Sequence, residues 1–92
     1  MGQIKEQDFS EVEEILSAPY AVIVWNDEVH SFEFVIDCLM KCVGHQQEQA
    51  EQCTFLIHFK GKCDVKRGEK DKMQKIYNNL SSCGLTVTLE EM

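Results

Sequence analysis

Several side chains in this sequence of 92 residues can accept hydrogen bonds from a polar ligand. Asn26, Asp27 and Glu28 stand together directly after an apolar run, and His58 follows a second apolar segment. The formal net charge of −7 suits a cationic ligand such as a free α-ammonium group, which has three hydrogen-bond donors and no acceptor. Taken singly, an Asn-Asp pair is typical of turns and a lone histidine is more often structural, so the residue types alone do not assign a site.

Five cysteines offer a second kind of chemistry. Cys38 and Cys42 share a helical face and His45 follows closely, a spacing that could hold a metal ion or support thiol catalysis. The Cys38–Cys42 pair lacks the closely spaced knuckle of strong zinc motifs. An odd number of cysteines without a secretion signal indicates reduced thiols, which pack as small apolar side chains. We therefore expect no metal and no cofactor, and keep a Cys/His metal-binding or thiol protein as an alternative.

The composition limits the class of protein. With 43% apolar residues in 92, the chain is expected to form one small folded domain. The negative net charge argues against a nucleic-acid partner, because phosphate binding needs a basic patch. No segment reaches the roughly 18 to 20 apolar residues that span a bilayer, and the polar start has no apolar signal core. We expect a cytoplasmic protein with no membrane partner.

The hydrophobic periodicity predicts six elements. An apolar β-branched run and two later alternating stretches indicate strands, and three stretches with helical spacing end near Gly44, Gly61 and Gly84. In chain order these elements are a strand at 20–25, helices at 32–43 and 47–58, a strand at 62–67, a helix at 69–83 and a strand at 85–89. Residues 1–18, which are acidic and polar, are predicted to be a flexible N-terminal arm before a domain at 19–92. The order β-α-α-β-α-β predicts an α/β (α+β) two-layer sandwich, with a three-stranded antiparallel sheet packed against three helices.

An ordered set of motifs resembles the ClpS adaptor family. The longest match is Val24–Ile36, in which an apolar strand ends in Asn-Asp-Glu and a short loop leads into a helix containing Glu-Phe-Val. Further matches stand at family spacing downstream, at Glu48–Gln52, Ile57–Lys62 and Thr88–Glu90. No single tripeptide is specific, whereas the ordered set is, and it covers roughly residues 20 to 92.

The resemblance implies a non-enzymatic adaptor. Members of this family bind N-degron substrates through a free N-terminal hydrophobic residue, usually Leu, Phe, Tyr or Trp. They dock on the N-terminal domain of a ClpA- or ClpC-like AAA+ ATPase, which receives the substrate for degradation. By family position, the α-amine site implied here consists of Asn26, Asp27, Glu28 and His58. The hydrophobic pocket implied for the first side chain consists of Phe32, Val35, Thr54, Ile57 and Leu85.

Three departures from the family pattern leave details open. Glu28 replaces the commoner Asp, and Phe32 and Thr54 stand where many relatives carry Met. The sequence therefore does not set the preferred first residue, the partner ATPase or the oligomeric state. A second alternative is a ClpS-like N-degron-binding module of a ubiquitin ligase, because some ligases contain a related domain.

Overall fold

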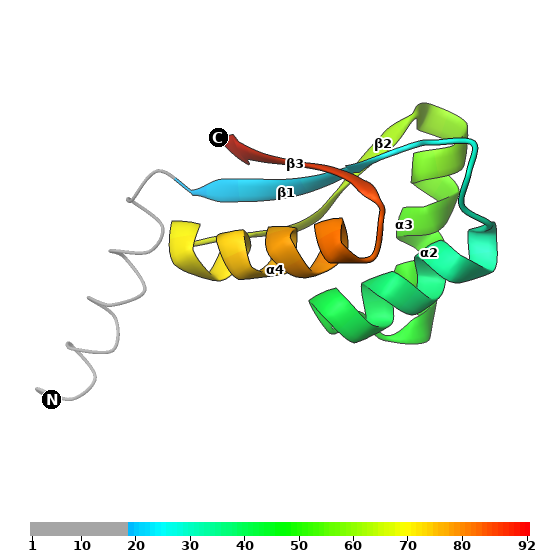
Figure 1. Cartoon of the computed structure of the whole chain (residues 1–92), viewed down its shortest axis with the longest axis horizontal. Coiled ribbons are helices and arrows are strands. Elements are labelled where there is room, and N and C mark those ends of the chain that lie inside the picture. The colour runs from blue at the N-terminus through cyan, green and yellow to red at the C-terminus, as the bar shows by residue number, and fades with distance from the viewer. Residues whose placement is uncertain (1–18) are drawn as a thin grey trace, which may run out of the picture.

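A computed structural model describes residues 19–92 of the chain (Figure 1). Its elements are β1 (Tyr20–Trp25), α2 (Phe32–Cys38), a π-helical turn η1 (Leu39–Val43), α3 (Gln47–Lys60), β2 (Lys62–Gly68), α4 (Lys70–Ser82) and β3 (Thr86–Glu91). The predicted order of strands and helices is confirmed. The predicted arm at 1–18 lies outside the described residues and stays a prediction.

The three strands form one antiparallel sheet in the order β2-β1-β3, as predicted. The central strand β1 pairs with β2 from Tyr20↔Gly68 to Trp25↔Lys62, with a register irregularity between Val22 and Ile23. On its other edge β1 pairs with β3 in unbroken register. Because β1 has a partner on both sides and four consecutive buried residues, it fixes where both neighbouring strands begin and end.

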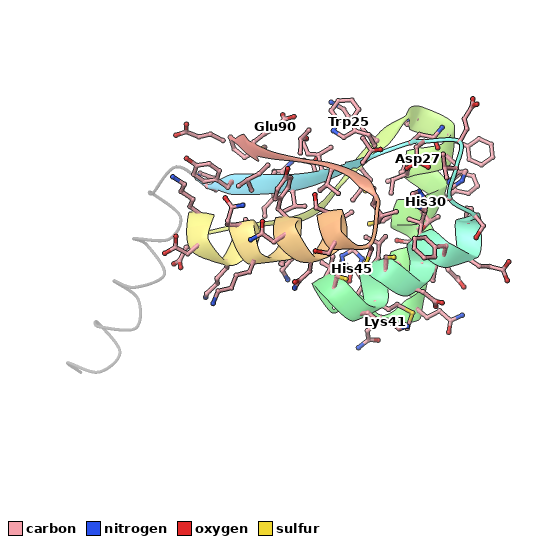
Figure 2. All side chains as sticks on the ribbon, in the orientation of Figure 1. Trp25, Asp27, His30, Lys41, His45 and Glu90 are labelled. Atoms are coloured by element: carbon pink, nitrogen blue, oxygen red, sulfur yellow. The ribbon has the colours of Figure 1, made fainter. Side chains whose placement is uncertain are left out.

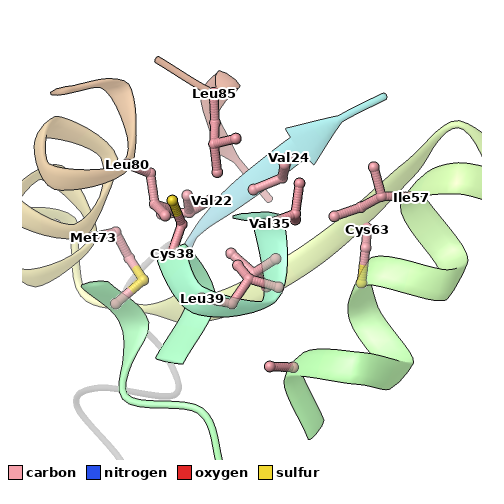
Figure 3. Packing of buried hydrophobic residues seen from close by; sticks show 12 residues of the cluster. Val22, Val24, Val35, Cys38, Leu39, Ile57, Cys63, Met73, Leu80 and Leu85 are labelled. Atoms are coloured by element: carbon pink, nitrogen blue, oxygen red, sulfur yellow. The ribbon is translucent and has the colours of Figure 1, made fainter. Parts of the chain in front are cut away.

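The core lies between the sheet and the helices (Figure 3). Val22 and Val24 point from β1 toward this layer, and each helix contributes a buried stripe. The buried helical residues include Val35, Cys38 and Leu39 from the first helical segment, Ala50, Thr54 and Ile57 from α3, and Met73 and Leu80 from α4. The buried residues within each helix thus recur at helical spacing and form one inward-facing stripe.

On the opposite face of the sheet, side-chain contacts among the described residues link the three strands. Trp25 alternates away from the helices, and its Nε1–H donates to Thr88 Oγ1 at 2.9 Å. Lys62 Nζ lies 5.1 Å from the centre of the Trp25 ring. These contacts join all three strands at the end of the sheet from which β1 runs toward α2 (Figure 1).

Local signals explain the element boundaries. Ser31 caps α2, because its Oγ accepts a hydrogen bond from the Phe34 N–H at 3.1 Å. The helix predicted at 32–43 changes to π geometry after Cys38, where the Gly44 N–H bonds to the Leu39 carbonyl. α3 extends two residues beyond the predicted end to Lys60, because the left-handed conformation that stops it is at Gly61, with φ of 94°.

Removing one core side chain tests this packing. Leu80 is fully buried in the cluster that joins α4 to the sheet. Leu80→Ala should lower the free energy of unfolding by about 2 to 5 kcal/mol, because it removes buried methyl groups and leaves a cavity. Urea unfolding followed by circular dichroism measures the change. Lys75→Ala, an exposed change on the same helix, should stay within about 0.5 kcal/mol of the parent. A loss below about 1 kcal/mol in Leu80→Ala would contradict this packing.

Candidate functional site

One backbone hydrogen bond brings the loop after β1 to the end of α3. The Asn26 N–H donates to the Gly61 carbonyl at 2.8 Å, and the Gly61 N–H in turn donates to the Ile57 carbonyl at 3.0 Å. Because His58 directly follows Ile57, this link places Asn26 and His58 at the same end of the molecule. Asn26 is exposed there and His58 is half-buried.

The Asp27 carboxylate organises its own loop (Figure 2). Its Oδ1 accepts hydrogen bonds from the backbone N–H groups of Val29 and His30, each at 3.0 Å. The His30 Nδ1 lies 2.9 Å from the same oxygen and 3.0 Å from Oδ2, and the Thr86 hydroxyl donates to Oδ2 at 3.4 Å. Most of the acceptor capacity of Asp27 is therefore used inside the protein. What Asp27 presents at the surface is mainly its negative charge and the loop shape that its contacts maintain.

These contacts act on the acidity of Asp27. Burial raises the pKa of the Asp27 carboxyl, but hydrogen bonds from the His30 N–H, the His30 ring and the Val29 N–H together outweigh it. The net result is that the pKa of the Asp27 carboxyl lies below its ordinary value of 3.8. Asp27 therefore stays ionised near neutral pH.

The remaining acidic residue of the set is placed differently. Glu28 follows Asp27 in the loop and is exposed. None of the hydrogen bonds or ion pairs between described residues uses its carboxylate. Among the described residues, both of its oxygens are therefore left without a partner, next to the Asp27 carboxylate whose contacts lie within the loop.

The His58 ring has a defined donor and a defined acceptor. Its Nδ1 lies 3.1 Å from the Thr54 carbonyl, one turn earlier on α3. A carbonyl oxygen only accepts, so Nδ1 carries the proton and Nε2 of the neutral ring keeps its lone pair. The Phe32 ring lies against the histidine, with 5.2 Å between ring centroids. The imidazole is thus held by α3 on one side and by the start of α2 on the other.

The five residues expected to form a hydrophobic pocket divide into two groups. Val35, Thr54, Ile57 and Leu85 are all buried, and the Thr54 hydroxyl donates to the Ala50 carbonyl at 2.7 Å. Phe32 differs, since 38% of its surface is exposed. Val35, Ile57 and Leu85 belong to one core cluster, Thr54 is buried on α3, and Phe32 lies at the surface.

His30 was not among the predicted site residues, although it completes the loop. Besides binding Asp27, its ring stacks on Phe34 of α2 with centroids 4.9 Å apart. The sequence signal for this contact is an Asp three residues before a polar residue in a loop, which is typical of side chains that bond their own backbone. That signal was present but indicated a turn rather than a partner for the histidine.

The cysteines form two groups that do not match the predicted metal alternative. The sulfur atoms of Cys42 and Cys83 lie 3.6 Å apart. Burial, and to a smaller extent a hydrogen bond with Cys83, raises the pKa of Cys38 to about 12. The Cys63 thiol lowers the pKa of Cys53 to about 7, against the effect of burial. Within residues 19–92, no three Cys, His, Asp or Glu side chains are grouped to hold a metal ion.

The buried His45 has a structural partner instead. Its Nε2–H donates to the Val65 carbonyl on β2 at 2.8 Å, so the ring ties the segment after η1 to the sheet. The alternative that Cys38, Cys42 and His45 form one site is therefore not supported, because His45 turns to β2 and helical spacing does not show which way a side chain after the helix points.

Changing Asp27 to its neutral isostere should alter the pH dependence of stability. Because the folded pKa is below the unfolded value, the stabilisation by Asp27 is present above about pH 4 and is lost as pH falls through the folded pKa. The parent protein should therefore lose more unfolding free energy than Asp27→Asn between pH 6 and pH 2. Urea unfolding at stepped pH measures both. Equal losses in the two proteins would contradict the assigned contacts.

Three comparisons place the chain among known proteins. The family model described as "ATP-dependent Clp protease adaptor protein ClpS" matches residues 16–88. An ATP-dependent Clp protease adapter protein ClpS of Rhodococcus opacus is 28% identical over 85 residues, covering 92% of this chain and 76% of the relative. One of Corynebacterium diphtheriae is 27% identical over 88 residues, covering 96% and 78%.

A solved structure has a similar fold. It is Agrobacterium tumefaciens ClpS2 bound to L-phenylalaninamide, which superposes with a TM-score of 0.78 at 21% identity. The match covers 82% of this chain and 98% of that chain. Among residues 19–92 of the present chain, no helix combines the length and the apolar character needed to cross a bilayer.

Proposed function

The chain belongs to the ClpS family of Clp protease adaptors, and from this membership we propose that it binds the free N-terminal residue of N-degron substrates. The first residues concerned are Leu, Phe, Tyr and Trp. The bound substrate is delivered to a Clp ATPase–protease for degradation. The chain acts by binding in the cytoplasm and is not an enzyme.

The observation that carries the proposal is the orientation of the His58 ring. Since Nδ1 donates to the Thr54 carbonyl, Nε2 can only accept, and an ammonium group can only donate. The exposed side chain of Asn26 and the free carboxylate of Glu28 add acceptors at the same end of the molecule. Asp27 adds a fixed negative charge. Three donors of an α-ammonium group would thus meet three acceptors, at about 1.5 to 3 kcal/mol for each charged hydrogen bond.

The side chain of the bound residue would enter the apolar cluster of Phe32, Val35, Thr54, Ile57 and Leu85. Burying a Leu or Phe side chain contributes about 1.5 to 3 kcal/mol. Four of these residues are closely packed, so Phe32 is the member that can turn aside without opening a buried cavity. The ligand named in the ClpS2 structure, L-phenylalaninamide, combines a free α-amine with an aromatic side chain, and so has both features that this site would recognise.

We assign the partner as the N-terminal domain of a ClpA- or ClpC-like AAA+ ATPase. The support is the shared description of the matched family model and relatives, all of which are Clp protease adaptors. This description favours a Clp protease over a ubiquitin ligase as the recipient of the substrate.

Acetylation of the substrate tests the amine site. A peptide that begins with Phe should bind at least about tenfold more weakly after N-acetylation, because the acetyl group removes the positive charge and two donors. Fluorescence anisotropy with labelled peptides gives both dissociation constants. Equal affinity of the free and acetylated peptides would contradict the proposed function.

Two variants provide the matching test on the protein side. Asn26→Ala keeps the backbone N–H that bonds to Gly61, so it removes only the side-chain acceptor, and His58→Ala removes Nε2. Each should weaken binding of the free peptide by about tenfold. Gln49→Ala, an exposed change on the same helix, should bind as the parent does.

Delivery is tested separately from binding. A fluorescent protein that begins with Phe should be degraded by a reconstituted Clp ATPase–protease at least about threefold faster when the chain is added. The same reporter with an N-terminal Ser should be unaffected. Loss of fluorescence measures the rate. Tight peptide binding with no acceleration by either a ClpA- or a ClpC-type ATPase would contradict the assigned partner.

A further inference from the structure

A groove runs along the outer face of α3, on the side away from the core. It encloses about 630 Å³ and is lined by residues we call the α3 groove: Phe32, Glu48, Glu51, Gln52, Phe55 and Leu56. Only Phe32 is shared with the site described above. The other five have no role in packing the core or in holding the ammonium group.

The floor of the α3 groove is unusually apolar for an exposed helix face. Phe55 is 53% exposed and Leu56 is 39% exposed, and both belong to the same helix. Phe59 is 72% exposed and stacks on Phe55 with ring centroids 4.3 Å apart. Single exposed apolar residues are normal on a small protein, whereas a contiguous group of aromatic side chains marks a contact surface.

The far end of the groove is acidic. Glu48 and Glu51 both line it and are three residues apart, which places them on one face of α3. Within residues 19–92, the Glu51 carboxylate accepts one hydrogen bond, which Gln47 Nε2 donates at 3.1 Å. An adjoining hollow of about 410 Å³ is lined by Gln46, Glu48, Gln49 and Gln52. Neither hollow has a basic lining residue, so the chemistry offered is apolar contact beside negative charge.

The groove is continuous with the proposed amine site. Phe32 lines the groove and also lies against the His58 ring, at 5.2 Å between centroids. With a rise of about 1.5 Å per helical residue, Glu51 lies about 10 Å and Glu48 about 15 Å from His58 along the axis of α3. An extended peptide advances about 3.3 Å per residue, so a chain held by its first residue at His58 comes level with Glu51 about three residues later and with Glu48 about five residues later.

We propose that the α3 groove binds residues two to six of the substrate and favours apolar and basic side chains over acidic ones. This inference rests on the proposed function, because it needs the first residue to be held beside His58. Phe32, Phe55 and Leu56 supply the apolar contact, and Glu48 and Glu51 supply the charge that selects Lys or Arg. The groove then ranks substrates that share the same first residue.

Three peptides with the same N-terminal Phe test this subsite. They carry Lys, Ser or Glu at positions three and four and are otherwise identical. At low salt the Lys peptide should bind about two- to fivefold more tightly than the Ser peptide, and the Glu peptide weaker by a similar factor. The spread should shrink as salt is raised to about 0.5 M, because exposed charges are screened. Fluorescence anisotropy measures all three affinities.

The double variant Glu48→Lys with Glu51→Lys should flatten or reverse this order while leaving the Ser peptide within about twofold of its parent affinity. Glu91→Lys is the control, since it adds positive charge at the exposed end of β3, far from α3 (Figure 1). It should keep the original order. Equal binding of the three peptides by the parent, or an unchanged order in the double variant, would overturn the inference. Failure of the proposed function would give a different result: the Ser peptide would bind equally well with a free and with an acetylated N-terminus.

Discussion

The site depends on one backbone hydrogen bond, from the Asn26 N–H to the Gly61 carbonyl. Asn26 is the first residue after the central strand, and Gly61 is the left-handed residue that ends α3. An L side chain at Gly61 would be strained at that φ, so glycine is what allows the helix to stop there and turn directly into β2. The bond thereby fixes the distance between two segments that are separated by more than thirty residues in the sequence.

The polar residues next to this hydrogen bond have different structural roles. Asp27 faces inward along its own loop, and its hydrogen bonds to Val29 and His30 hold the chain in position for Ser31 to cap α2. His58 faces a carbonyl with one nitrogen and has a lone pair on the other. In the proposed function, this rigid carboxylate and oriented imidazole would need little rearrangement to receive an ammonium group, so less ordering entropy would oppose binding.

The sequence predicted the elements well because each boundary has a local cause. The apolar run of β1, the cap at Ser31 and the glycines that end the helices act within a few residues of the chain. The π-helical turn was not predicted, because it depends on the Gly44 N–H reaching back to Leu39 rather than on residue type. The spacing predicted a helix at 47–58, yet periodicity did not show that Phe55 and Phe59 would stack on the outside of α3. The motif order predicts which residues form the site, but it does not show that the Asp27 carboxylate is used inside its own loop, since that depends on how the loop folds.

The most direct measurement is long-range ¹H–¹⁵N NMR of the His58 ring at alkaline pH, where the imidazole is neutral. The free protein should show the tautomer with the proton on Nδ1. Addition of a Phe-first peptide with a free amine should shift the Nε2 resonance, and the acetylated peptide at the same concentration should not. A proton on Nε2 in the free protein, or the same Nε2 shift with both peptides, would contradict capture of the ammonium group by His58.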